Sequence, residues 1–259
     1  MPLIPSPRHV DRDLAAWERE ARFDPVLAQD RRLDQLTAQA IDIIRMFADQ
    51  GPCHAGTSWG KDSVVLAHLV LQADVDVPVV WATEETGDHE NPDCYTVRDT
   101  FLEMHPDLDY LEWTFRWRVP LRPEPGWDDP ANHQDVLAEM NADLAPRYLS
   151  GVRQDESSTR KVAVAKHGLI SANTARPIGH WTAQHIWAYL ERHQLPIHPA
   201  YAMNFAGSFD RNRLRVHSLG TLGGGAKRYL WEDRYYPDIV RPAAGRQAWQ
   251  DRMHFEETR

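Results

Sequence analysis

The chain has 259 residues, a formal net charge of −9 and 42% hydrophobic side chains, which is enough apolar material for a sizeable core. The acidic balance argues against broad, non-specific nucleic-acid binding, because proteins of that class carry a basic excess. No apolar run approaches the roughly 20 residues that a membrane helix needs, and the first residues lack the regions typical of a signal peptide. We therefore expect a soluble, cytoplasmic protein that binds no membrane.

Two cysteines, Cys53 and Cys94, occur in the sequence. Two are too few for a four-cysteine zinc site or an iron–sulfur cluster within one chain, so we expect no such cluster. Cys53 is predicted to be an inert buried side chain, whereas a redox role for Cys94 remains an alternative. The thirteen histidines show no metal-binding spacing, so no protein metal site is predicted.

Residues 1–50 are predicted to form an N-terminal helical layer that docks on the rest of the chain. Apolar residues recur there at three- and four-residue spacing, which is the pattern of one buried helix face. They are Leu33, Leu36, Ala40, Ile43, Ile44 and Phe47.

From residue 51 the pattern changes to strand (53–56), loop, helix (63–71) and strand (77–82), which predicts a parallel βαβ unit. A polar loop, a helix at 92–104 and a strand at 108–115 repeat it. We therefore predict an α/β domain over 51–205, with an open, mostly parallel twisted sheet and helices on both faces.

Later segments are less regular. Residues 116–135 have no clear period and are interpreted as an irregular insertion that could cover a site. A strand is predicted at 148–152, a helix at 180–193, and a C-terminal extension over 206–259. Between residues 207 and 234, six Lys or Arg face three acids around a Gly-rich run at 220–225. This stretch is either a flexible surface loop or a second anion site, for an acceptor or a nucleic-acid end.

The sequence GTSWGKDS at 56–63 lies where a strand is predicted to open into a helix. Such a turn directs backbone N–H groups and the positive end of the helix dipole at one point, which suits a phosphate. Gly60 permits close approach, Lys61 adds charge, Ser58 and Ser63 supply hydroxyls, and Asp62 caps N–H groups or orients the lysine. An ordinary turn with a surface lysine is the alternative. A Walker-type loop is disfavoured, because three residues separate its two glycines where that pattern needs four.

The same stretch resembles the Ser-x-Gly-Lys-Asp-Ser PP-loop of the adenine nucleotide α-hydrolase superfamily. Three further stretches are similar to motifs of the phosphoadenylyl-sulfate (PAPS) reductase and sulfate adenylyltransferase small-subunit family. They are Thr86 and Gly87 with Glu90, Asn91 and Pro92, the run 151–160, and the run 177–201. The four matches occur in the family's order and cover about residues 50–220.

The resemblance implies the superfamily's fold and a site for ATP, or for PAPS or adenylyl sulfate (APS). The residues that it implies for nucleotide binding are Ser58, Trp59, Gly60, Lys61, Asp62, Ser63, Thr86, Gly87, Gly151 and Glu156. Catalytic roles are carried over to Lys61, on the leaving pyrophosphate, and to Arg153 and Arg160, on an anionic acceptor or the α-phosphate. Mg²⁺ is expected to arrive with ATP and to touch Asp62 or Glu156, and a salt bridge to an arginine is the alternative for Glu156.

The family members differ in their reaction. The reductases use a cysteine in a C-terminal tail, and no cysteine follows Cys94 here, which disfavours a conventional reductase. The main hypothesis is therefore an ATP-binding enzyme that cleaves at the α-phosphate, releases pyrophosphate and adenylates an anionic acceptor such as sulfate. The alternatives are a sulfonucleotide reductase or sulfur-transfer enzyme with an external thiol, and a non-catalytic nucleotide sensor. A protein partner, such as a GTPase or thioredoxin, or a homo-oligomer stays open.

Trp59 lies inside the loop, where related loops carry a bulky apolar residue as well as glycine, and we expect its backbone N–H to face phosphate while its ring packs against the sheet or lines the pocket. Two features depart from the family pattern, namely His185 and the run at 220–228. His185 stands where the family usually has Asp, so a helix capped by Thr182 is predicted to lose its reciprocal capping partner.

Overall fold

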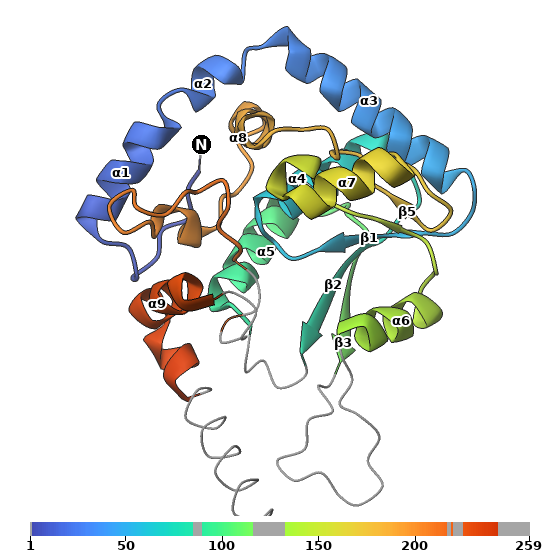
Figure 1. The fold of residues 1–259 in the computed structure, drawn as a ribbon. Helices are drawn as coiled ribbons and strands as arrows, with labels where there is room; N and C mark the ends of the chain where they lie inside the picture. Colours follow the sequence, from blue (N-terminus) through green and yellow to red (C-terminus); the bar gives the residue numbers. More distant parts are fainter. Residues whose placement is uncertain (1, 85–89, 116–132, 217–218, 220–224, 243–259) are drawn as a thin grey trace, which may run out of the picture.

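The computed structural model describes residues 2–84, 90–115, 133–216, 219 and 225–242 (Figure 1). Its centre is a five-stranded sheet in the order β3-β2-β1-β4-β5, and every pair of neighbouring strands is parallel. The strands are β1 (His54–Thr57), β2 (Val79–Glu84), β3 (Tyr110–Phe115), β4 (Tyr148–Leu149) and β5 (Thr174–Ala175). The predicted open parallel α/β sheet is confirmed.

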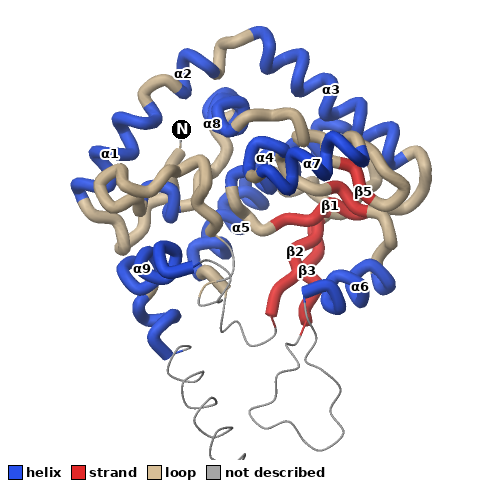
Figure 2. Tube along the Cα trace, in the orientation of Figure 1, coloured by secondary structure: helices blue, strands red, loops and turns tan. Residues whose placement is uncertain are grey.

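The first two βαβ units match the sequence pattern closely. Helix α4 (Lys61–Ala73) links β1 to β2, and α5 (Pro92–Met104) links β2 to β3. Helix α5 begins with proline after the N-cap Asn91, whose side-chain oxygen accepts the Asp93 N–H at 3.1 Å. Figure 2 shows α5 and α6 (His133–Asp143) on opposite sides of β2 and β3.

The strand order places β1 beside both β2 and β4. The chain leaves β1 toward β2 on one side and later returns to β4 on the other, so the loops after β1 and β4 diverge at this point. In open α/β sheets such a switch point opens a crevice at the carboxyl ends of the strands, which is where ligands bind.

The N-terminal helices α1 (Asp11–Ala21), α2 (Asp24–Leu27) and α3 (Arg31–Ala48) arch over the sheet domain (Figure 1). The predicted apolar face of α3 is buried at Leu33, Ala40, Ile43, Ile44 and Phe47. Helix α3 contacts α4, α8 (Ala183–Arg192) and the short strand β5, so this layer packs mainly on helices and reaches one edge of the sheet.

A buried ion pair attaches α2 to the C-terminal half of the chain. The Arg211 guanidinium donates to both carboxylate oxygens of Asp24, at 2.7 and 2.8 Å. The Arg211 Cζ atom also lies 5.1 Å from the ring centre of Trp17 and 4.4 Å from the ring centre of Trp187. This arrangement stabilises the segment that leads to residues 213–216.

Several elements differ from the sequence prediction. The strand predicted at 148–152 ends at Leu149, although the Ser150 N–H still donates to the Ala175 carbonyl of β5 at 2.8 Å. Helices α7 (Ser158–His167) and α9 (Gly225–Tyr235), the 3-10 turns η1 (Gln154–Glu156) and η2 (Pro199–Ala202), and β5 were not predicted. The last three residues of the predicted 116–135 insertion begin α6, and its remainder, like residues 220–224 of the Gly-rich run, lies outside the described residues.

The helices in the described part of the chain are all too short or too polar to cross a membrane.

Candidate functional site

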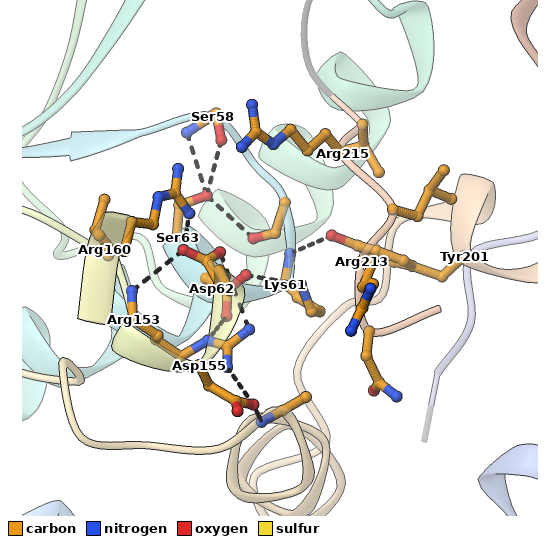
Figure 3. Close-up of a pocket in the computed structure, with 18 of the residues that line it drawn as sticks. Ser58, Lys61, Asp62, Ser63, Arg153, Asp155, Arg160, Tyr201, Arg213 and Arg215 are labelled. Carbon is orange, nitrogen blue, oxygen red and sulfur yellow. Dashed lines mark hydrogen bonds and ion pairs between the residues drawn. The ribbon is translucent and has the colours of Figure 1, made fainter. Parts of the chain in front are cut away.

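A cavity of about 890 Å³ opens at the carboxyl ends of β1 and β4, at the switch point of the sheet (Figure 3). Its walls come from the loop 56–63, the segment 151–160, the start of α8, Tyr201 and the segment 210–216. The basic side chains in the walls are Lys61, Arg153, Arg160, Arg213, Arg215 and Arg228. Four acidic side chains, Asp62, Asp155, Glu156 and Asp210, lie among them. The described walls therefore carry an excess of positive charge in an acidic protein.

The loop after β1 is held by its own hydroxyl groups. The Ser58 N–H donates to Ser63 Oγ at 3.2 Å, and the Ser63 hydroxyl donates to the Gly60 carbonyl at 3.0 Å. The two serine oxygens lie 3.3 Å apart. Gly60 is the N-cap of α4 and offers no side-chain cap, so the first turn of the helix keeps backbone N–H groups for a ligand.

Gly60 is also a position of close approach. A Cβ atom there would lie 3.3 Å from both Tyr201 Oη and Val216 Cγ2. The Tyr201 hydroxyl accepts the Lys61 N–H at 3.0 Å, and its ring is buried beneath the loop. The Tyr201 hydroxyl therefore holds the backbone at the start of α4.

Trp59 has its ring inside the protein. The ring is 0% exposed and packs against Phe101 and Tyr110, with centroid distances of 5.6 and 5.5 Å. Its φ is +55°, in the left-handed region, and its N–H donates to Thr57 Oγ1 at 3.3 Å. The ring thus takes the first of the two expected positions, against the sheet and its helix. The Trp59 N–H, expected to face the phosphate, has Thr57 as its acceptor in this structure.

An ion network lies at the start of α4. Asp62 accepts from Lys61 Nζ at 2.8 Å and from Arg153 Nε at 2.6 Å, and Figure 3 shows its carboxylate between the two cations. The Arg153 side chain is 1% exposed and also lies 3.6 Å from Asp155. Burial lowers the pKa of Lys61, and the Asp62 carboxylate opposes that shift. Arg153 is thus held mainly by protein carboxylates and positions Asp62.

Arg160 lies on the first turn of α7, where the Ser157 hydroxyl caps its N–H at 3.2 Å. Its guanidinium forms an ion pair with Glu156, so the structure shows the salt-bridge alternative for that carboxylate. Burial and the neighbouring Arg215 charge lower the pKa of Arg160.

Gly151 brings the two sides of the switch point together. A Cβ atom at this position would lie 3.4 Å from the Asp62 carbonyl oxygen, so glycine lets the chain after β4 pack against α4. Thr86 and Gly87 lie outside the described residues, whereas Asn91, which follows them, is buried. Its side-chain amide donates to the Val216 carbonyl at 2.7 Å and so anchors the opposite wall.

The expected Mg²⁺ does not fit this donor set as a protein-bound ion. Asp62 and Glu156 are each already neutralised by arginine. In the described part of the chain, no group of three or more His, Cys, Asp or Glu could hold a metal.

Both cysteines are buried, and neither contributes to the described walls of the cavity. The Cys94 Sγ lies 3.4 Å from His198 Nε2 and 3.6 Å from the Ser58 carbonyl, behind the loop. Burial raises the pKa of Cys94, which keeps it a thiol rather than a nucleophilic thiolate.

The prediction that the helix capped by Thr182 lacks a reciprocal capping partner is wrong, because His185 takes that role. Its Nδ1 accepts the Thr182 N–H at 3.0 Å, and Thr182 Oγ1 accepts the His185 N–H at 3.4 Å. The capping box at the start of α8 is therefore complete, because a neutral imidazole nitrogen replaces the carboxylate as acceptor.

The structure also adds wall residues to which sequence reasoning gave no role. Tyr201, Asp210, Arg213, Arg215 and Arg228 all line the cavity. The signal for most of them was the local basic excess over 207–234, although nothing in that pattern separates cavity residues from surface residues. Arg211, in the same stretch, is directed away into its ion pair with Asp24.

Comparison with known proteins gives three kinds of likeness. The family model for the phosphoadenosine phosphosulfate reductase domain matches residues 127–212. A phosphoadenosine 5′-phosphosulfate reductase of Xylella fastidiosa (strain 9a5c) is 26% identical over 186 residues, which cover 64% of this chain and 75% of that protein. An adenosine 5′-phosphosulfate reductase of Bacillus mycoides (strain KBAB4) is 24% identical over 159 residues, covering 57% and 67%.

Solved structures with a similar chain course include two enzymes. The PAPS reductase of Candida auris has a TM-score of 0.38 at 14% identity and covers 65% of this chain and 89% of its own. The NH3-dependent NAD synthetase of Campylobacter jejuni has a TM-score of 0.44 at 14% identity and covers 85% and 95%.

The domain match contains two of the four motif stretches, 151–160 and 177–201, and both contribute residues to the cavity walls. This chain is therefore similar to the phosphoadenosine phosphosulfate reductase domain over residues 127–212 and to named PAPS and APS reductases.

Proposed function

We propose that the cavity binds an adenine sulfonucleotide and that the chain promotes its cleavage by a thiol supplied from outside. The observation that carries the proposal is the basic cavity at the β1–β4 switch point, in a chain whose curated relatives are named PAPS and APS reductases. The first turn of α4 has no side-chain cap from Gly60, and with Lys61 and Ser58 beside it this turn is the expected position of the 5′-phosphate end.

The chemistry requires two thiols. A thiolate attacks the sulfur of the sulfate group, the S–O bond to the phosphate breaks, and the nucleoside phosphate leaves with the electron pair. A second thiolate then displaces sulfite and forms a disulfide, so the two thiols supply both electrons. Because both cysteines of this chain are buried, these thiols come from a reducing partner or a small dithiol. We place the reaction in the cytoplasm, where thiols stay reduced.

Adenylyl transfer is the second candidate. It is favoured by the content of the described walls, which hold six basic side chains and no cysteine. ATP would place its β- and γ-phosphates at the start of α4, and an anionic acceptor would attack the α-phosphate. Lys61 and Arg160 would then stabilise the charge on the leaving pyrophosphate and on the acceptor.

A binding and product assay separates the candidates. AMP, ATP, APS and PAPS are titrated into the protein, and each complex is then supplied with dithiothreitol or thioredoxin, or with Mg²⁺ and sulfate. Thiol-dependent release of sulfite supports the reductase reaction, whereas release of pyrophosphate from ATP supports adenylyl transfer. Binding without either product indicates a sensor, and failure of all four nucleotides to bind rejects the proposal.

Lys61→Ala tests the position of the nucleotide. Loss of a charged hydrogen-bond donor from the cavity is expected to weaken nucleotide binding by about tenfold or more. Lys166→Ala is the matched control, because this exposed lysine lies in the last turn of α7, outside the cavity walls. Equal affinities of the two variants would show that the nucleotide does not reach the start of α4.

A further inference from the structure

Arg215 projects into the cavity from an extended piece of chain. Its two neighbours, Leu214 and Val216, are buried at 7% and 3% exposure, whereas Arg215 itself is exposed. Alternate side chains of an extended chain point to opposite sides, so burial of both neighbours directs Arg215 outward. This residue is part of the cavity wall.

The segment that carries Arg215 is fixed on both sides. The Asn91 amide donates to the Val216 carbonyl at 2.7 Å, and the Arg228 guanidinium donates to the Arg215 carbonyl. Arg228 is in turn held by Glu232 at 2.6 Å. The backbone beneath Arg215 is therefore ordered before any ligand arrives, which lowers the entropy lost on binding.

Arg215 also differs from the other basic wall residues in its charge balance. Lys61 and Arg153 share Asp62, Arg160 pairs with Glu156, Arg228 pairs with Glu232, and Arg213 lies 3.7 Å from Asp210. Among the residues that the structure describes, no carboxylate lies within ion-pairing distance of Arg215.

Arg215 and Arg160 face the same part of the cavity. Figure 3 shows the Arg215 guanidinium extending toward Ser58, with that of Arg160 on the other side of this serine. Both residues line the same cavity, and burial together with the Arg215 charge lowers the pKa of Arg160. Like charges in one cavity repel each other, and an anion bound between them offsets the repulsion.

We propose that Arg215 and Arg160 form an oxyanion subsite above Ser58, which binds a tetrahedral sulfate- or phosphate-type group. The subsite shares its cavity with the nucleotide of the proposed function and rests on it for the identity of the full ligand. The group has two candidate sources, namely a second phosphate on the nucleotide or a separate inorganic oxyanion. Planar guanidinium groups bind such oxyanions through two parallel hydrogen bonds.

The test measures binding of four probes by calorimetry: AMP, adenosine 3′,5′-bisphosphate, inorganic sulfate and inorganic phosphate. In Arg215→Gln, affinity for the bisphosphate or for the inorganic ion is expected to fall by about tenfold or more, whereas AMP affinity changes little. A loss confined to the bisphosphate assigns the group to the nucleotide. A loss for sulfate or phosphate assigns it to a separate ion.

Two comparison variants keep the test specific. Arg241→Gln removes the same charge from a side chain that pairs with Asp233 outside the cavity walls, and it is expected to bind all four probes as the wild type does. Arg213→Gln removes a charge from the same segment two residues away. If Arg213→Gln and Arg215→Gln weaken the binding of all four probes by the same factor, the cavity attracts anions through a diffuse positive field, and the proposed subsite is rejected. If Arg215→Gln binds every probe like Arg241→Gln, the proposal also fails.

The outcomes separate the subsite from the proposed function. Binding of AMP without any effect of Arg215 retains the nucleotide site and rejects the subsite. Arg215-dependent binding of sulfate without binding of any adenine nucleotide retains the subsite and rejects the function. The exposed Arg215 side chain makes no stabilising ion pair in the described structure, so the variant is expected to unfold at the wild-type temperature.

Discussion

The two walls of the cavity use their positive charges differently. The first wall, called the β1 wall below, is formed by the loop after β1 together with the segment after β4 that packs on it. In this wall Lys61 and Arg153 are buried and neutralised by Asp62, and the loop hydroxyls bond to one another. On the opposite side, residues 213–216 hold their backbone tightly but leave Arg215 without a carboxylate partner among the described residues. The number of basic residues in a cavity therefore does not show which of them can bind a ligand. That depends on which of them are already paired with carboxylates of the protein.

The largest effect is expected from the buried side of this comparison. Arg153→Ala removes a partner of Asp62 and leaves a partly buried carboxylate with Lys61 alone. The free energy of unfolding is expected to fall by about 3–5 kcal/mol, as measured by urea denaturation. An unchanged midpoint would mean that the Asp62 network does not hold the β1 wall together.

Acid should weaken the β1 wall next. Burial lowers the pKa of His198, which lies behind the loop, and that of the distant His68, each from 6.5 to about 3. The unfolded chain therefore binds more protons than the folded chain, so stability is full above pH 6.5 and falls as the pH drops toward 3. The slope is expected to approach about 1.4 kcal/mol per pH unit for each histidine.

His198→Asn separates the two contributions. The side-chain oxygen of the new asparagine can replace the His198 Nδ1, which accepts the Ala200 N–H at 3.1 Å, while the titrating imidazole is removed. Between pH 6 and 4, the slope of the unfolding free energy against pH should then decrease by the contribution of one histidine, about 1.4 kcal/mol per pH unit. A slope equal to that of the wild type would contradict the assignment of His198.

Tyr201→Phe gives a smaller effect on the same wall. Without the phenolic oxygen, the buried Lys61 N–H loses its acceptor at the start of α4. Such a loss typically costs about 1–3 kcal/mol, measurable as a lower thermal midpoint. If water replaces the hydroxyl, stability is retained and Tyr201 does not fix the loop by this bond.

Arg213→Gln should have the smallest effect. Its side chain is 87% exposed and its carboxylate partner lies 3.7 Å away. Exposed ion pairs contribute little, so the free energy of unfolding is expected to change by less than about 0.5 kcal/mol. A loss as large as that of Arg153→Ala would overturn the contrast between the two walls.

The sheet was largely predictable from the sequence, and the two walls were predictable to different degrees. Hydrophobic spacing and the turn at 56–63 indicated β1, α4, β2 and α5 to within a few residues, because these elements are mostly buried. Helix α7 and the two-residue strand β5 have no comparable pattern. They form where tertiary contacts override weak local preferences.

The candidate site shows the same limit. Motif spacing located Lys61, Asp62 and Arg153, yet the pairing of Arg153 with Asp62 joins residues 91 positions apart and has no sequence signal. Likewise, the basic excess near the C-terminus did not distinguish Arg211, which is buried against Asp24, from Arg215, which faces the cavity. The direction in which each side chain leaves the backbone in the folded protein decides which of the two faces the cavity.

The left-handed backbone of Trp59 has a thermodynamic consequence. A glycine at this position would move freely in the unliganded loop, and its rotational freedom would be lost each time a ligand bound. The Trp59 ring, wedged between Phe101 and Tyr110, removes that freedom when the chain folds. The loop is thereby ordered when the chain folds, so the entropy of ordering it would not oppose binding of the proposed anion.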